Sequence, residues 1–191
     1  ALRLDDADAM IKACHDNGCR LFVVKQNRFN VPVMKLREAV EENRFDQLVL
    51  GTVRVRWCRD QNYYNLDDWR GTWSQDGGVL TNQASHHIDM LAWMMGDVES
   101  VFAKATTGLA DIGTEDTAVV TLRFKNGALG IVETTTATRP GNLEGSISIL
   151  GEKGSVVIGG VAVNKIETWT FEEELDEDAM VREKFSVNPP N

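Results

Sequence analysis

The second half of the chain alternates apolar and polar residues with a period of two, and this pattern limits the fold more than any other feature. Five successive runs carry it: VESVFAKATTG, DTAVVTLRF, ALGIVETTTA, EGSISIL and GSVVIGG. Such runs, separated by turn residues, predict strands with one buried and one exposed face. We therefore expect an α+β protein with a largely antiparallel open sheet and helices on one face. The polar face would meet solvent, a pocket or another subunit.

Two tight turns connect neighbouring runs. Asn126-Gly127 is the strongest hairpin signal in the sequence, and GEKG at 151–154 is a second turn. A two-residue loop would set Phe124 opposite Leu129, with Leu122 and Ile131 on the same apolar face. The alternate residues of the first strand would then point the other way: Val119, Thr121, Arg123 and Lys125.

The first half of the chain predicts two helices and two strands. Residues 4–17 have an amphipathic helical pattern that ends at Gly18, and a second helical repeat begins at Pro32. LFVVKQN at 21–27 is a short valine-rich run of the kind found in buried strands. Residues 47–59 alternate again. They would place Val53, Val55 and Trp57 on one face, and Arg54 and Arg56 on the other.

A helix followed by a buried strand is typical of the end of an α/β domain. We therefore expect residues 1–30 to belong to such a domain, whose beginning is absent from this sequence, and residues 31–191 to form a second domain. The last stretch, FEEELDEDAMVREKFSVNPPN, is acidic and ends in prolines, so we expect it to be loosely held.

Charge and composition exclude several classes of partner. A net charge of -9 argues against nucleic acid or an anionic membrane as a binding partner. No apolar run approaches the roughly 18 residues that a membrane span needs, and no signal segment is visible. Cys14, Cys19 and Cys58 are odd in number and fit no zinc spacing, which indicates reduced thiols and a cytoplasmic protein.

The stretch from Trp69 to Gly96 holds the most chemistry. It predicts a short helix whose first turn contains Asn82, His86 and Asp89. A histidine at this end of a helix is favoured in its neutral form, which a general base needs. Asn82 and His86 are four residues apart, so they would share a helical face and form a catalytic pair. The alternative is a helix cap and a partly buried histidine. The neighbouring His87 is expected to be structural.

Other kinds of site receive less support. A metal site built from His86, Asp89 and the cysteines lacks a third histidine near by, so we expect no metal. No G-x-S-x-G nucleophile motif is present, and GEKGSVVIGG lies in a strand turn, so it is not a dinucleotide-binding loop.

Several arginines lie near aromatic residues in the predicted sheet and its loops: Arg54, Arg56, Arg59, Arg70 and Arg139. Guanidinium groups suit carboxylates and phosphates, and aromatic rings suit the faces of sugars or bases. Residues 60–78 are a long aromatic-rich loop, which favours a functional role. The alternative is ordinary ion pairing with the abundant Asp and Glu.

Three segments resemble the Gfo/Idh/MocA family of sugar oxidoreductases. GGVLTNQASHHIDMLAWMMGDV resembles the signature of its substrate domain, VKQNRFNVPVMKLREAV its N-R-F segment, and LEGSISILGEKGSVVIGG its strand-turn-strand ending. The phrases NQASHHIDML and TTATRPGNLEGS are most similar to the UDP-N-acetylglucosaminuronate 3-dehydrogenases of bacterial O-antigen (lipopolysaccharide) assembly.

The resemblance implies NAD-dependent oxidation of the C3 hydroxyl of a UDP-sugar uronate. His86 would assist removal of the hydroxyl proton, and Asn82 takes the place of an aspartate that many members carry. Asparagine cannot accept a proton, so a histidine–aspartate relay is not expected. The residues expected to bind substrate are Arg139, Arg70, Trp69, Arg56 and Tyr64, and those expected to bind cofactor are Asn27 and Arg28.

The resemblance also implies a domain organisation. The family's N-terminal Rossmann domain, with its G-x-G-x-x-G loop, is not in this sequence, so residues 1–30 would be its last helix and strand. Residues 31–191 would bind substrate and form a homo-oligomer through the sheet, and we expect the chain alone to be inactive. The alternatives are another sugar or polyol dehydrogenase of the family, or a non-catalytic oligomerisation or sugar-binding module.

Overall fold

A computed structural model describes residues 3–187. Its helices are α1 (Leu4–Asp16), the 3-10 helix η1 (Gln26–Phe29), α2 (Val31–Glu41), α3 (Gln61–Tyr64), α4 (Ser85–Met95) and α5 (Asp176–Phe185). Its strands are β1 (Leu48–Arg56), β2 (Val98–Thr106), β3 (Thr117–Phe124), β4 (Leu129–Thr135), β5 (Glu144–Gly151), β6 (Gly154–Gly159) and β7 (Lys165–Phe171). None of the helices in the described range is both long and apolar enough to cross a membrane.

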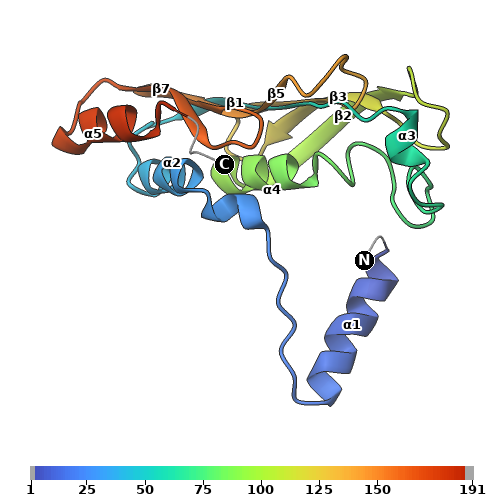
Figure 1. Ribbon diagram of the computed structural model, residues 1–191. Coiled ribbons are helices and arrows are strands. Elements are labelled where there is room, and N and C mark those ends of the chain that lie inside the picture. The colour runs from blue at the N-terminus through green and yellow to red at the C-terminus, as the bar shows by residue number, and fades with distance from the viewer. Residues whose placement is uncertain (1–2, 188–191) are drawn as a thin grey trace.

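The strands form one seven-stranded open sheet in the order β2-β3-β4-β1-β5-β6-β7. Every neighbouring pair is antiparallel except β1 and β4, which run parallel. Helices α2 and α4 lie against one face, while the opposite face is free of helices (Figure 1). The predicted α+β class, with a largely antiparallel open sheet and helices on one face, is therefore confirmed.

The core lies between α4 and the middle of the sheet. Leu91 and Met95 of α4 contact β1 at Gly51, where a Cβ atom would lie 2.7 Å from Leu91 Cδ1. Val53 and Ile147 on the same sheet face are completely buried. The first turn of α4 therefore lies beside the carboxyl end of β1. Gly145 of β5, which pairs with Val55 of β1, is so close to this turn that a Cβ on it would lie 3.3 Å from His87 Nε2.

The register of the β3–β4 hairpin differs from the prediction. Leu129 lies opposite Arg123, and the amide of Phe124 donates to the carbonyl of Ala128 at 2.9 Å. Gly127 has φ +90° whereas Asn126 does not have positive φ, so the turn is not the expected two-residue type. A shift of one residue moves every side chain to the other face. Leu129 and Ile131 therefore lie on the helix-free face, opposite to the buried Phe124.

The predicted strand at 21–27 is wrong for the described structure. Residues 19–25 are extended but unpaired, and η1 follows them. Phe22 and Val23 are 77% and 78% exposed, and α1 buries none of its residues. Figure 1 shows this segment descending from the sheet layer to α1. A strand requires a hydrogen-bonding neighbour, and none of the described strands is near it.

The prediction of a loosely held C-terminal stretch is wrong as far as residue 187. Helix α5 packs on β7, and the Asp178 carboxylate accepts hydrogen bonds from Arg44 (2.7 and 2.9 Å) and from Trp169 Nε1 (2.6 Å). Burial opposes the charged form of Asp178, but these bonds and one from the Leu175 amide outweigh it and lower its pKa to about 2. The prolines at 189–190 lie outside the described residues.

Candidate active site

His86 lies in the first turn of α4, where η1 crosses it. Its Nε2 is 3.3 Å from the side-chain nitrogen Nε2 of Gln26, and its buried Nδ1 has no hydrogen-bond partner among the described residues. If the Gln26 amide donates, Nε2 is the acceptor and Nδ1 carries the hydrogen, since a neutral imidazole has one of each. The basic nitrogen then points toward η1, away from the core.

The surroundings of His86 favour the neutral ring. Burial lowers its pKa below the ordinary 6.5, the charge of Lys25 lowers it further, and Asp89 acts in the opposite direction. The helix start adds a positive end of the backbone dipole. A pKa below 6.5 favours the unprotonated ring at neutral pH, which a general base needs.

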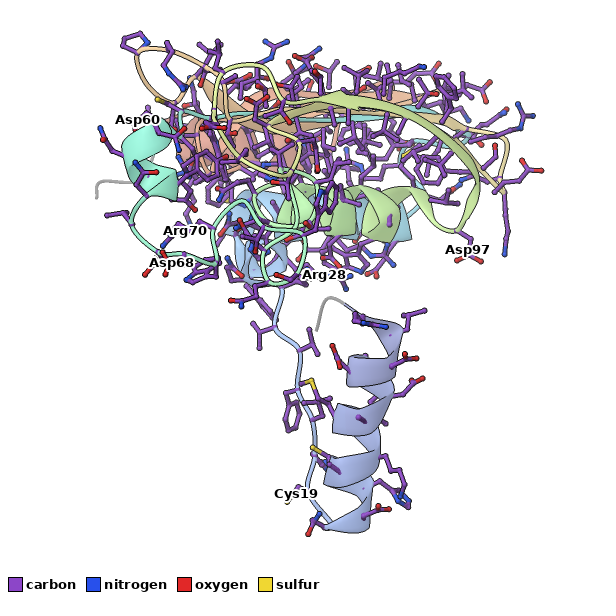
Figure 2. All side chains as sticks on the ribbon, turned by 90° about the vertical axis from the view of Figure 1, so that its right-hand side faces the viewer. Cys19, Arg28, Asp60, Asp68, Arg70 and Asp97 are labelled. Atoms are coloured by element: carbon purple, nitrogen blue, oxygen red, sulfur yellow. The ribbon has the colours of Figure 1, made fainter. Side chains whose placement is uncertain are left out.

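Arg28 holds η1 against α4. Its Nε and Nη2 donate to the two carboxylate oxygens of Asp89 at 2.7 and 2.8 Å, and its guanidinium lies 4.7 Å from the Trp93 ring. The hydrogen bond to Asp89 raises the pKa of Arg28. Asp89 therefore serves this pair and not the His86 imidazole, and Arg28 is committed to a structural contact. Figure 2 shows Arg28 on the helix side of the sheet, where the extended segment begins.

Asn82 is not in the helix, which corrects the prediction that it shares the first turn with His86. Helix α4 begins at Ser85, and Ala84 is its cap without a side-chain bond. The Asn82 amide nitrogen donates to Asp76, and its oxygen accepts from Gln83 Nε2 at 3.1 Å. These contacts fix the turn before the helix, so the structure does not bring the Asn82 side chain to His86.

An alternating stack of aromatic rings and guanidinium groups lies beside this turn. Arg59 is 5.4 Å from the Trp57 ring and 5.2 Å from the Tyr63 ring. Arg70 lies 4.5 Å from the Tyr63 ring and 4.5 Å from Trp69. We call Trp57, Arg59, Tyr63, Arg70 and Trp69 the arginine–aromatic stack. Tyr63 connects it to the turn before α4, since its hydroxyl accepts from Gln83 at 3.1 Å.

The other candidate substrate residues have different surroundings. Arg139 donates to the carbonyls of Thr136, Thr138 and Arg59, which places it next to the stack. Tyr64 is buried and its hydroxyl bonds Thr136 at 2.9 Å, so its polar atom is already used. The structure therefore brings Arg139 to the stack, whereas Tyr64 is buried next to Thr136.

Arg56 lies on the helix-free face, as the sequence pattern predicts. It makes a two-bond contact with Glu133 at 2.7 and 2.9 Å and also donates to Glu144 at 3.1 Å. The sheet separates it from His86, which is on the opposite face. The structure does not bring Arg56 together with the other candidate substrate residues.

His87 is completely buried and packs edge-on against Trp57, with 5.7 Å between the ring centres. Neither ring nitrogen has a hydrogen-bond partner within the described range. Burial lowers its pKa to about 4, and His86 contributes a smaller effect in the same direction. His87 therefore supports the Trp57 end of the arginine–aromatic stack from the core.

The structure adds residues that the sequence candidates did not include: Gln26, Asp76 and Gln83. The sequence signals for two of these residues are weak. Gln26 directly precedes the N-R-F segment, and Gln83 lies three residues before His86. Of the predicted cofactor residues, Asn27 belongs to η1 and Arg28 is paired with Asp89. Within residues 3–187, no three His, Cys, Asp or Glu side chains are grouped so that they could hold a metal ion.

Comparisons with solved structures give two close matches. The WlbA dehydrogenase from Bordetella pertussis, solved in complex with NADH and UDP-GlcNAcA, shares 49% identity with a TM-score of 0.91 over 95% of this chain and 55% of that chain. The WlbA dehydrogenase from Chromobacterium violaceum, with the same two ligands, shares 47% identity with a TM-score of 0.92 over 97% of this chain and 54% of that one.

Curated sequences and family profiles agree with these matches. Myo-inositol 2-dehydrogenase of Thermotoga maritima is 32% identical over 166 residues, which are 84% of this chain and 47% of the relative. The chain thus spans about half the length of the proteins it matches. Residues 33–157 match the GFO/IDH/MocA C-terminal domain. The chain therefore belongs to the GFO/IDH/MocA family of oxidoreductases and contains its C-terminal domain.

Proposed function

We propose that this chain is the substrate-binding part of an NAD-dependent dehydrogenase that oxidises the C3 hydroxyl of UDP-N-acetylglucosaminuronate to a ketone. The observation that carries the proposal is the position of His86 in the first turn of α4, which the Gln83 turn connects to the arginine–aromatic stack. The identity of nearly half to two WlbA dehydrogenases solved with NADH and UDP-GlcNAcA supports this substrate over others in the family.

The reaction assigns a clear task to this chain. Oxidation of an alcohol to a ketone releases a hydride, which NAD⁺ accepts, and a hydroxyl proton, which a base must accept. His86 Nε2 takes the proton when the substrate hydroxyl replaces the Gln26 side-chain amide as the hydrogen-bond donor to that nitrogen. Arg70 is already paired with Asp67 at 2.9 Å, so Arg139 is the expected arginine that attracts the negative charges of the nucleotide sugar. Trp69 offers a partly exposed ring face.

The described residues fit the substrate better than the cofactor. The sequence has no G-x-G-x-x-G loop to cradle a pyrophosphate, and Arg28 is already paired with Asp89. The exposed Phe22 and Val23 would be covered if residues 1–30 completed the sheet of a nucleotide-binding domain. We therefore assign residues 1–30 to that domain and 31–191 to substrate binding.

The test is NADH formation at 340 nm, with the full-length protein and with these 191 residues. UDP-N-acetylglucosaminuronate should be oxidised by the full-length protein only, and myo-inositol should not be oxidised. His86→Ala should lower kcat by about 100-fold or more with little change in KM, because it removes a base and not a binding group. Oxidation of myo-inositol in preference to the nucleotide sugar would overturn the proposed substrate.

A second role is assembly through the helix-free face of the sheet. Arg54 and Arg56 lie within 3.5 Å of both Glu133 and Glu144, so the centre of this face carries balanced charges. Leu129, on the same face of β4 as Glu133 but at the other end of the strand, is 52% exposed. A face with equal numbers of opposite charges can match a second copy of itself across a two-fold axis. We propose that homo-oligomers form here.

Glu133→Arg should shift the sedimentation coefficient to that of a monomer, and an unchanged coefficient would contradict this interface.

A further inference from the structure

Almost all arginines in the described structure have a carboxylate partner. Nine of the twelve arginines in the sequence lie within 4.0 Å of an Asp or Glu oxygen. Within residues 3–187 the exceptions are Arg20, Arg59 and Arg139. Arg20 lies in the extended N-terminal segment. Arg59 and Arg139 contact each other, because Arg139 Nη2 donates to the Arg59 carbonyl at 3.3 Å. In a chain of net charge -9, two arginines that contact each other and have no carboxylate partner among the described residues indicate a site for an external anion.

The Arg59 guanidinium is held in one orientation. Trp57 and Tyr63 flank it, its Nη1 donates to the Cys58 carbonyl at 2.8 Å, and its Nη2 donates to Gln83 Oε1 at 3.0 Å. A guanidinium has five N–H groups, and Nη1 makes its second bond to the Asn142 side chain. The Nε–H and one Nη2 hydrogen have no acceptor among the described residues. A free Nε–H together with a free Nη2 hydrogen can bind two oxygens of one anion.

The position of Arg59 couples these two N–H groups to the proposed base. Gln83, which accepts from Arg59, lies in the turn that leads into α4, three residues before His86. Gln83 also contacts Tyr63 and Asn82, so the same turn fixes both the stack and the start of the helix. An anion bound at Arg59 is thereby set at a fixed place relative to His86.

We propose that Arg59 determines specificity for an anionic group of the substrate, bound through two oxygens of a carboxylate or a phosphate, with Arg139 adding a second positive charge. The proposal rests on the proposed function, since it specifies how that substrate is selected. The sequence groups Arg59 with the other arginines near aromatic residues but does not select it to bind substrate, because its isolation from carboxylates is visible only in the folded chain.

The test uses the full-length protein and three variants. Arg59→Gln removes the charge but keeps a planar hydrogen-bonding group, and Arg59→Lys restores the charge without the two N–H groups. Arg182→Gln is the matched control, because Arg182 pairs with Glu174 next to α5. Circular dichroism and thermal unfolding establish that each variant is folded. Binding is measured by calorimetry and turnover by NADH formation, with UDP-N-acetylglucosaminuronate and with UDP-N-acetylglucosamine, which has the diphosphate but lacks the carboxylate.

Arg59→Gln should raise KM and Kd for the uronate by about 10- to 100-fold, the range for a lost charge-assisted hydrogen bond. Arg59→Lys should recover part of this loss, and Arg182→Gln should match the wild type. If binding of UDP-N-acetylglucosamine is unaffected, the group is the carboxylate; an equal loss for both ligands identifies the phosphate. A folded Arg59→Gln with wild-type Kd and KM for both ligands would overturn the inference.

The two proposals fail in different ways. If the wild type oxidises the uronate and Arg59→Gln does so with the same KM, the proposed function stands and this inference falls. If the wild type binds UDP-sugars in an Arg59-dependent manner but oxidises neither, the anion site stands and the proposed function falls. Thus binding tests the site independently of turnover.

Discussion

At the residue scale, the protonation state of His86 depends on burial first and then on two charged neighbours. Burial and Lys25 lower its pKa, and Asp89 raises it. Activity that needs the neutral ring is lost as the pH falls through this pKa. We therefore expect the acidic limb of kcat/KM in the full-length enzyme to lie below pH 6.5, the ordinary value for histidine.

Lys25→Gln tests this electrostatic account. Removal of the positive charge should raise the pKa of His86, so the acidic limb of kcat/KM should move to higher pH while the plateau changes little. Lys184→Gln on α5 removes the same charge far from the site and serves as the control. A limb that stays in place in Lys25→Gln would contradict the coupling between Lys25 and His86.

The buried His87 makes stability depend on pH in the opposite sense to a salt-bridged histidine. Its folded pKa of about 4 lies below the 6.5 of the unfolded chain. Between these values the unfolded state takes up a proton that the folded state does not, so the free energy of unfolding falls as the pH decreases from 6.5 to 4. The slope is about 1.4 kcal/mol per pH unit.

His87→Leu removes this titration and the two unpaired nitrogens. Relative to wild type, the variant should gain about 2 kcal/mol in free energy of unfolding between pH 7.5 and pH 5.0. Urea unfolding at the two pH values measures the difference. Equal differences at both pH values would show that folding does not lower the pKa of His87.

At the element scale, the turn between the stack and α4 depends on two glycines. Gly77 has φ +71°, and a Cβ on Gly78 would lie 1.9 Å from the Glu115 carboxylate, which is buried. The turn therefore packs against the loop before β3 more closely than any side chain allows. This contact sets where Asn82 and Gln83 lie.

Gly78→Ala should lower the free energy of unfolding by about 1–3 kcal/mol, the usual cost of overpacking a buried site. In the full-length enzyme, kcat should fall as well, because the displaced turn moves the start of α4. Gly141→Ala is the matched control, since it has no atom within 4 Å of the added Cβ. Chemical denaturation and NADH formation measure both effects, and wild-type values for Gly78→Ala would contradict the close contact.

The elements also show where pattern reasoning succeeds. Helices α1 and α4 end close to their expected positions, because Gly18 and Gly96 have positive φ and stop a helix locally. The predicted β3–β4 register was wrong by one residue. The sequence cannot distinguish the possible conformations of an Asn-Gly turn, whereas the burial of Phe124 at 0% exposure selects one of them.

At the scale of the whole molecule, the N-terminal segment stands apart from the rest. Helix α1 and the extended residues after it lie away from the sheet in both views (Figures 1 and 2). Phe22, Val23 and Val24 are each at least 66% exposed. Protease cleaves most easily where the backbone is extended and unpaired.

Limited proteolysis of the 191-residue chain should therefore cut first within residues 19–25. The same peptide bonds should be protected in the full-length protein, if residues 1–30 complete a nucleotide-binding domain there. Mass spectrometry of the first fragments identifies the cut. Equal cleavage of both proteins would contradict the assignment of residues 1–30 to such a domain.

The sequence by itself determined the α+β class, the alternation of the strands, the helix ends and the family resemblance, because these depend on local periodicity and short motifs. The tertiary structure alone decided which side chains meet. It separates Arg56 from His86 by the thickness of the sheet, turns Asn82 toward Asp76, pairs Arg28 with Asp89 and leaves Arg59 without a carboxylate. Charge pairing between residues distant in the chain follows from packing, and no local pattern records it.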